Sequence, residues 1–218
     1  MKFSLIITSI LFITNTGFSQ SIHTYIPRTI DKAGRYMFYL HGKIIEEQGV
    51  HATHPQLGKY EYLGILDSLN KNGFNVISEV RPKDTDEKVY ANKVNAQLDS
   101  LLKAGVPAKN IFVLGASKGA YIALWVSAKA KNKDLNFIIM GTCSDETTVD
   151  LNGYELCGRF LSIFESSDSF ATSCVKMLSN KKCVKTFNEI KLTLNIGHAF
   201  LYKPYREWMD PMIKWAGK

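Results

Sequence analysis

The chain has 218 residues, of which 45% are hydrophobic and 22% are charged, and its formal net charge is +7. These proportions are those of a globular protein and exclude a disordered, collagen-like or cysteine-dense small chain. The basic residues are spread along the sequence, and the longest basic run is Lys181-Lys182, so there is no basic stripe for nucleic acid.

The first 19 residues have the layout of a secretory signal peptide. Met1-Lys2 is a basic start, an apolar stretch of nine residues follows at 5–13, and small residues precede a cleavage point between Ser19 and Gln20. That stretch is too short to cross about 30 Å of hydrocarbon, and the alternative is a buried N-terminal helix. We expect a secreted or periplasmic protein without stable membrane insertion, whose residues 20–218 form a single domain.

Short apolar runs then alternate with segments of helical periodicity. Strands are expected at residues 35–40, 74–80, 111–114, 135–140, 161–164 and 191–196. Helices are expected at 60–70, 85–103, 118–129 and 204–215, the second with Val89, Val94, Leu98, Leu101 and Leu102 on one side. Strands joined through helices need crossover connections, which predicts an α/β fold with a mainly parallel sheet and helices on both faces.

Four cysteines lie in the mature chain, and an even number in an oxidising compartment favours disulfides. None has the C-x-x-C spacing of a zinc site. Three connectivities are open, and free buried thiols are the alternative. We expect nearest-neighbour pairing, Cys143–Cys157 and Cys174–Cys183.

The pentapeptide Gly115-Ala116-Ser117-Lys118-Gly119 lies between an apolar strand and an apolar helix. A G-x-S-x-G sequence in that setting predicts a sharp turn that exposes the serine hydroxyl, and the glycines let strand and helix pack closely. Ser117 is therefore the candidate nucleophile, at the positive end of a helix. The alternative is a glycine-rich turn with an incidental serine.

A serine hydroxyl needs a base, and the base needs an acid to orient it. His198 follows the last expected strand, after a glycine that gives its loop freedom to turn. The loop after residues 161–164 offers Asp168 and Glu165, of which Asp168 is favoured because it lies farther into the loop.

The order Ser117, Asp168, His198 resembles that of the α/β-hydrolase fold family, over the chain from about residue 35 to its end. The segment from Ser78 to Gly119 is similar to small secreted bacterial members. Only 27 residues separate Gly141 from Asp168, so a minimal fold without a large cap is expected. The resemblance also implies an oxyanion hole from the backbone N–H groups of Lys43, in a His41-Gly42-Lys43 turn, and Lys118.

Other polar residues near the expected strand ends are weaker candidates. Glu46, His54, Tyr60 and Arg81 are considered as substrate-pocket residues, with solvated or structural roles as the alternative. His51 and His54 invite a metal reading that would include Glu46 and Glu47, but their stretch has no helical periodicity. We expect no metal and no organic cofactor.

Together these features favour a secreted serine hydrolase that acts on a small or extended soluble ester or related acyl compound. A peptidase or acyltransferase would use the same residues. A non-catalytic binding protein on the same scaffold is the principal alternative.

Overall fold

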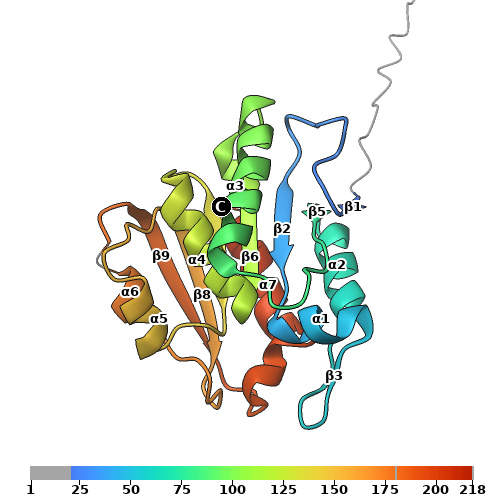
Figure 1. Cartoon of the computed structure of the whole chain (residues 1–218), viewed down its shortest axis with the longest axis vertical. Coiled ribbons are helices and arrows are strands. Elements are labelled where there is room, and N and C mark those ends of the chain that lie inside the picture. Colours follow the sequence, from blue (N-terminus) through green and yellow to red (C-terminus); the bar gives the residue numbers. More distant parts are fainter. Residues whose placement is uncertain (1–20, 180, 218) are drawn as a thin grey trace, which may run out of the picture.

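In a computed structural model of the chain, the described residues are 21–179 and 181–217, and the predicted signal peptide lies outside them. They form a sheet of seven parallel strands in the order β1-β5-β2-β6-β7-β8-β9 (Figure 1). The strands are β1 (Ile22–His23), β2 (Tyr36–Leu40), β5 (Asn75–Ile77), β6 (Ile111–Ala116), β7 (Asn136–Met140), β8 (Gly158–Glu165) and β9 (Val184–Leu192). A separate antiparallel hairpin pairs β3 (Thr53–His54) with β4 (Gly58–Lys59).

The helices cover both faces of the sheet, which confirms the predicted α/β fold (Figure 1). They are α1 (Lys43–Gln48), α2 (Tyr62–Lys71), α3 (Glu87–Lys103), α4 (Lys118–Ala130), α5 (Asp145–Asp150), α6 (Val175–Leu178) and α7 (Arg206–Ala216), with 3-10 turns η1 (Gly49–His51), η2 (Ala108–Asn110) and η3 (Gly197–Leu201). In β6, Ile111 and Val113 pack toward α3 and α4, whereas Phe112 and Leu114 pack toward α2 and α7. This alternation is what a strand buried on both faces requires.

Helix α3 shows how a local cap and an apolar stripe define an element. The Asp86 side chain accepts a hydrogen bond from the Val89 N–H at 2.8 Å and so caps the first turn. The buried side chains are Ala91, Val94, Leu98 and Leu101. The expectation that Val89 lies on the same side as Val94 was wrong. Val89 precedes Val94 by five residues and so points about 140° away, and 67% of it is exposed.

The predicted strand at 191–196 was also placed wrongly. The strand is β9, which ends at Leu192, and the chain then turns through Asn195 with a left-handed φ of 57°. β9 pairs with β8 alone, at the edge of the sheet, so many of its side chains are polar and exposed. The search for apolar runs therefore did not detect the strand before residue 191. The expected strand at 74–80 is shorter because the Ser78 hydroxyl bonds to the Tyr39 carbonyl oxygen at 2.7 Å as the chain leaves the sheet.

Two disulfides connect neighbouring strands rather than neighbouring cysteines. The bonds are Cys143–Cys174 and Cys157–Cys183, so the expected pairing was wrong. Cys157 and Cys183 directly precede β8 and β9, and parallel strands bring their amino ends together. Cys143 follows β7, and the segment after β8 brings Cys174 beside it. Among the described residues, no helix has the length and apolar character that crossing a membrane requires.

Candidate active site

Ser117 occupies a strained turn between β6 and α4. Its φ of 53° and ψ of −121° lie in a region that residues with a side chain rarely adopt. Three hydrogen bonds hold the turn. The Ser117 N–H donates to the Met140 carbonyl oxygen at 2.8 Å, and the Ser117 carbonyl oxygen accepts from the N–H groups of Ala120 at 2.8 Å and Tyr121 at 3.1 Å. The geometry is that of the predicted strand–turn–helix.

The two glycines of the pentapeptide make this turn sterically allowed. A Cβ atom on Gly119 would lie 1.8 Å from the Leu40 carbonyl oxygen, and one on Gly115 would lie 2.4 Å from the Ala120 Cα. Both neighbours are backbone atoms, which cannot move aside as a flexible side chain does. The start of α4 therefore rests directly against the end of β2, and Ser117 is placed above that contact.

His198 and Asp168 meet at the same end of the sheet. The His198 Nδ1 atom lies 2.7 Å from the Asp168 Oδ2 atom, and the Asp168 side chain is fully buried. Asp168 Oδ1 also accepts from the Phe170 N–H at 2.9 Å, which fixes the carboxylate plane. An ionised carboxylate only accepts hydrogen bonds, so Nδ1 carries the proton and Nε2 of the neutral imidazole is left as an acceptor.

Glu165, the other candidate acid, has a structural place. Its carboxylate accepts hydrogen bonds from the N–H groups of Ser167 at 2.8 Å, Leu194 at 3.0 Å and Asn195 at 3.1 Å. Burial raises the pKa of Glu165, but the hydrogen bond from the Ser167 hydroxyl and these N–H bonds lower it by more, so the pKa lies below its ordinary value. The ionised Glu165 thereby joins the Asp168 loop to the loop that precedes His198.

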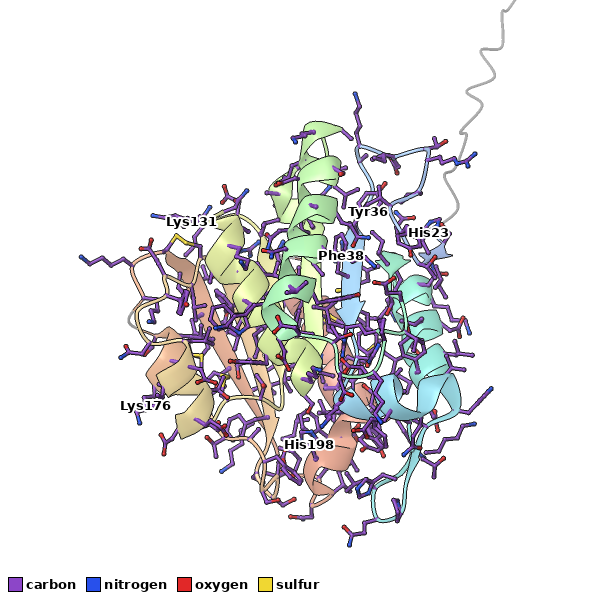
Figure 2. All side chains as sticks on the ribbon, in the orientation of Figure 1. His23, Tyr36, Phe38, Lys131, Lys176 and His198 are labelled. Atoms are coloured by element: carbon purple, nitrogen blue, oxygen red, sulfur yellow. A yellow bond between two sulfur atoms is a disulfide. The ribbon has the colours of Figure 1, made fainter. Side chains whose placement is uncertain are left out.

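Ser117 and His198 both line a cavity of about 560 Å³ at the carboxyl ends of the strands. In Figure 2 the labelled His198 lies at the end of the molecule toward which β2 runs from Tyr36 to Phe38. The Phe170 ring packs edge-on against the His198 ring, with centroids 5.2 Å apart. Phe170 is 70% exposed and forms part of the rim.

The cavity has two walls of different chemistry. The apolar wall belongs to the core layer that contains α1, α2 and α7, and consists of Ile44, Leu57, Tyr60, Leu201 and Tyr202. The polar wall comes from the segment after β7 and consists of Thr142, Ser144, Glu146 and Thr147. Because β6 lies between β2 and β7, Ser117 stands between the segment after β2, which supplies Ile44, Leu57 and Tyr60, and the segment after β7.

Two helix N-termini converge on Ser117. Lys43 is the first residue of α1 and Lys118 is the first residue of α4, and the first N–H groups of a helix have no acceptor within that helix. A Cβ atom on Gly42 would lie 3.7 Å from the Ser117 Cβ, which places the turn before Lys43 against the serine. Both residues line the cavity, so their N–H groups are candidate donors to an oxyanion.

Comparison with known proteins identifies the scaffold. The sequence matches no described protein family and no curated protein, but many solved structures share its architecture. A protein of unknown function from Agrobacterium tumefaciens, assigned to the α/β hydrolases, is 19% identical with a TM-score of 0.58 over 88% of each chain. This chain has the α/β-hydrolase fold.

Two further α/β-hydrolase-type neighbours cover most of the chain. The enzyme MGS-MChE2, from the metagenome of lagoon sediments at Mar Chica, Morocco, is 15% identical with a TM-score of 0.55, over 84% of this chain and 90% of its own. Est1E of Butyrivibrio proteoclasticus, with ferulic acid bound, is 10% identical with a TM-score of 0.53, over 87% of this chain and 89% of its own. As predicted, the α/β-hydrolase fold formed by residues 21–179 and 181–217 is compact and has no large cap. Identities this low establish the fold and leave the activity open.

On this α/β-hydrolase scaffold, the four weaker pocket candidates separate into two pairs. Tyr60 and His54 line the cavity. Glu46 and Arg81 are not among the lining residues, contrary to expectation, because their side chains are fully buried and paired, with Arg81 Nε 2.7 Å from Glu46 Oε1. The sequence showed two charged residues near strand ends, but it did not show that they would form a buried ion pair with each other.

His54, one of the two histidines considered and set aside for a metal site, has other partners. His54 Nδ1 accepts hydrogen bonds from the N–H groups of Gln56 and Leu57, both at 3.2 Å, and so stabilises the β3–β4 turn. Within residues 21–179 and 181–217, the one group of three metal-binding side chain types at ligand distance is Glu155, Cys157 and Cys183. Its two cysteines are joined in a disulfide, so their sulfur atoms are not thiolate ligands.

Several cavity residues were not anticipated. Phe170 lies two residues after Asp168, and Leu201 and Tyr202 lie three and four residues after His198, so closeness to predicted site residues in the sequence was the available signal. The polar wall had no such signal, because Ser and Thr residues in a loop are common without any function.

Proposed function

We propose that the protein is a serine hydrolase that cleaves an ester or related acyl bond through an acyl-enzyme. The observation that carries the proposal is Ser117 in a strained turn, lining one cavity with a His198 whose Nδ1 is held by a buried Asp168. A nucleophile, a base and an orienting acid are the minimum for this chemistry. No metal or organic cofactor is needed.

In the proposed reaction, the Ser117 hydroxyl oxygen attacks the carbonyl carbon of the substrate while His198 Nε2 takes the hydroxyl proton. The carbonyl oxygen becomes an anion and accepts hydrogen bonds from the Lys43 and Lys118 N–H groups, a stabilisation worth about 3 to 4 kcal/mol for a single donor. The bond to the leaving group then breaks, and His198 returns the proton to the departing oxygen. Asp168 holds the imidazole tautomer and stabilises its charged form.

Water completes the cycle. His198 removes a proton from a water molecule, which attacks the acyl-Ser117 carbonyl, and the same two N–H groups stabilise the second oxyanion. The carboxylic acid leaves, and Ser117 regains its proton. An amine or alcohol in place of water would give acyl transfer, and an amide substrate would give peptidase activity.

The cavity supports a small acyl substrate. Its volume of about 560 Å³ suits a molecule of drug-like size, and the apolar wall suits an uncharged acyl group. Est1E, a neighbour of the same fold, has ferulic acid bound, which is a small aromatic acid. The two disulfides support export to an oxidising compartment, in line with the predicted signal peptide.

The test uses a fluorophosphonate probe and p-nitrophenyl esters of graded chain length. We expect the wild-type protein to be labelled and to hydrolyse the shorter esters, and Ser117→Ala to do neither. His198→Ala should lower kcat by about 10³-fold or more. Labelling that survives the Ser117→Ala substitution refutes the assignment. A wild-type protein that is folded, unlabelled and inactive favours a binding protein on this scaffold.

A further inference from the structure

The buried carboxylate of Glu46 connects the two segments that carry the proposed oxyanion donors. Its Oε1 atom accepts from Arg81 Nε at 2.7 Å, and its Oε2 atom accepts from Lys118 Nζ at 2.8 Å. The Glu46 and Arg81 side chains are fully buried, and that of Lys118 is 12% exposed. A carboxylate bonded to two cations in the interior holds both in defined positions.

The Arg81 arm of this cluster reaches the turn before Lys43. The Arg81 guanidinium donates to the His41 carbonyl oxygen, and the Arg81 N–H donates to His41 Nε2 at 3.0 Å. His41 Nδ1 in turn bonds to the Gly42 carbonyl oxygen at 2.9 Å. Every polar atom of the imidazole is thus used to hold the turn, and Glu46 itself lies on α1, one turn after Lys43.

The Lys118 arm reaches the turn that carries the nucleophile. The Lys118 ammonium bonds to the Thr85 carbonyl oxygen at 2.6 Å, and lies 3.5 Å from Glu87 Oε1, in addition to its contact with Glu46. The Lys118 side chain is therefore held by Glu46, Thr85 and Glu87, which fixes the residue whose backbone N–H is the candidate oxyanion donor. The segments that follow β2, β5 and β6 thus meet at one carboxylate.

We propose that Glu46 is a positioning residue that sets the distance between the Lys43 and Lys118 N–H groups for the transition-state oxyanion. The inference rests on the proposed function, because it concerns the same site. Oxyanion donors act only when they are aimed at the position that the anion will occupy, and displacements near 1 Å cost about 10²-fold in rate. Glu46 touches no reacting atom, so its effect passes through the two donors.

The experiment compares Glu46→Gln with Glu47→Gln on the same helix. Glutamine keeps the size of Glu46 but removes the charge that holds Arg81 and Lys118 together. Glu47 is the matched control, because its side chain is 42% exposed and its ion-pair distance to Lys43 Nζ is 3.6 Å. We expect Glu46→Gln to lower kcat and kcat/KM on p-nitrophenyl acetate by the same factor, about 10- to 100-fold, with KM unchanged. Glu47→Gln should match the wild type.

A second readout separates positioning from a general structural role. A trifluoromethyl ketone forms a tetrahedral adduct with a serine and places an oxygen anion in the hole. Its affinity should fall by the same 10- to 100-fold in Glu46→Gln, whereas the affinity for the product acid stays the same. If Glu46→Gln does not fold, Lys118→Met removes one arm and leaves the Glu46–Arg81 pair, and Lys118→Arg should restore part of kcat.

The outcomes distinguish the two proposals. A wild-type enzyme that depends on Ser117, together with a folded Glu46→Gln that keeps its kcat or changes only KM, overturns the role of Glu46 alone. Equal losses in Glu46→Gln and Glu47→Gln overturn it as well. Activity that persists in Ser117→Ala overturns the proposed function and this inference with it.

Discussion

His41 makes the stability of this protein depend on pH below 6.5. It is fully buried beneath the turn that precedes Lys43. Burial, and next the charge of Arg81, lower the pKa of His41 from 6.5 to about 3. Between pH 3 and pH 6.5 this histidine is protonated in the unfolded chain but not in the folded chain. The free energy of unfolding therefore decreases as the pH falls below 6.5.

The size of the effect follows from this span. The slope approaches about 1.4 kcal/mol per pH unit, so between pH 7 and pH 5 the protein loses about 2 kcal/mol. Glu165, whose pKa is lowered, adds a loss only as the pH falls below its ordinary value of 4.5. For a domain of this size, 2 kcal/mol corresponds to a decrease in Tm of roughly 4 to 8 °C.

The assay is urea denaturation at pH 5, 6, 7 and 8 at constant ionic strength, followed by tryptophan fluorescence. In His41→Gln the side-chain oxygen can still accept from the Arg81 N–H but does not titrate. The free energy of unfolding of this variant should be lower than that of the wild type and should change less between pH 7 and pH 5. His51→Gln, at an exposed histidine, should keep the wild-type slope. A wild-type curve that is flat between pH 7 and 5, or an unchanged slope in His41→Gln, refutes the reasoning.

Three further substitutions test the site and its supports. Gly119→Ala should cost about 3 kcal/mol or more in a thermal melt, because its Cβ would lie 1.8 Å from the Leu40 carbonyl oxygen. Asp168→Asn should lower kcat by about 10⁴-fold at nearly unchanged Tm, because it favours the wrong tautomer of the histidine. Replacing Cys143 and Cys174 by serine should cost about 3.5 kcal/mol in urea, for a sequence separation of 31, and should also lower kcat because the Asp168 loop loses its tether.

Each of these predictions has a matched control in the chain. Gly153→Ala, at a φ of 87° with no atom within 4 Å of its Cβ, should cost only about 1 kcal/mol. Glu165→Gln should lose stability with a far smaller decrease in kcat than Asp168→Asn. Replacing Cys157 and Cys183, at the opposite ends of the strands, should cost similar stability and leave kcat unchanged. Equal kcat losses in the two disulfide variants would contradict a specific tether at the Asp168 loop.

The features that could be predicted from sequence are those encoded over a few residues. The turn at Ser117 is one, because its two glycines and flanking strand and helix are consecutive. The choice of Asp168 over Glu165 as the acid stays a prediction, but the two carboxylates have different contacts, because Asp168 is bonded to His198 and Glu165 is bonded to backbone. Helix and strand order followed from periodicity, and so did the fold class.

The features that escaped prediction depend on which segments become neighbours. Disulfide pairing follows strand adjacency, so Cys143 is bonded to Cys174 and not to Cys157, the next cysteine in the sequence. The roles of Glu46 and Arg81 depend on burial. From the sequence, charged residues near strand ends that contact a ligand cannot be distinguished from residues that form an ion pair with each other, as these two do. The bounds of the edge strand β9 were predicted wrongly because many of its side chains face water and interrupt the apolar run.

The two sides of the cavity differ in how freely they can change. Ile44, Tyr60 and Leu201 pack into the layer that also holds α2 and α7, so replacing them disturbs the interior. Glu146 is exposed on α5, the short helix after β7. A substitution there changes the cavity rim without removing a buried side chain, so this position tolerates more variety than the wall that packs into the core.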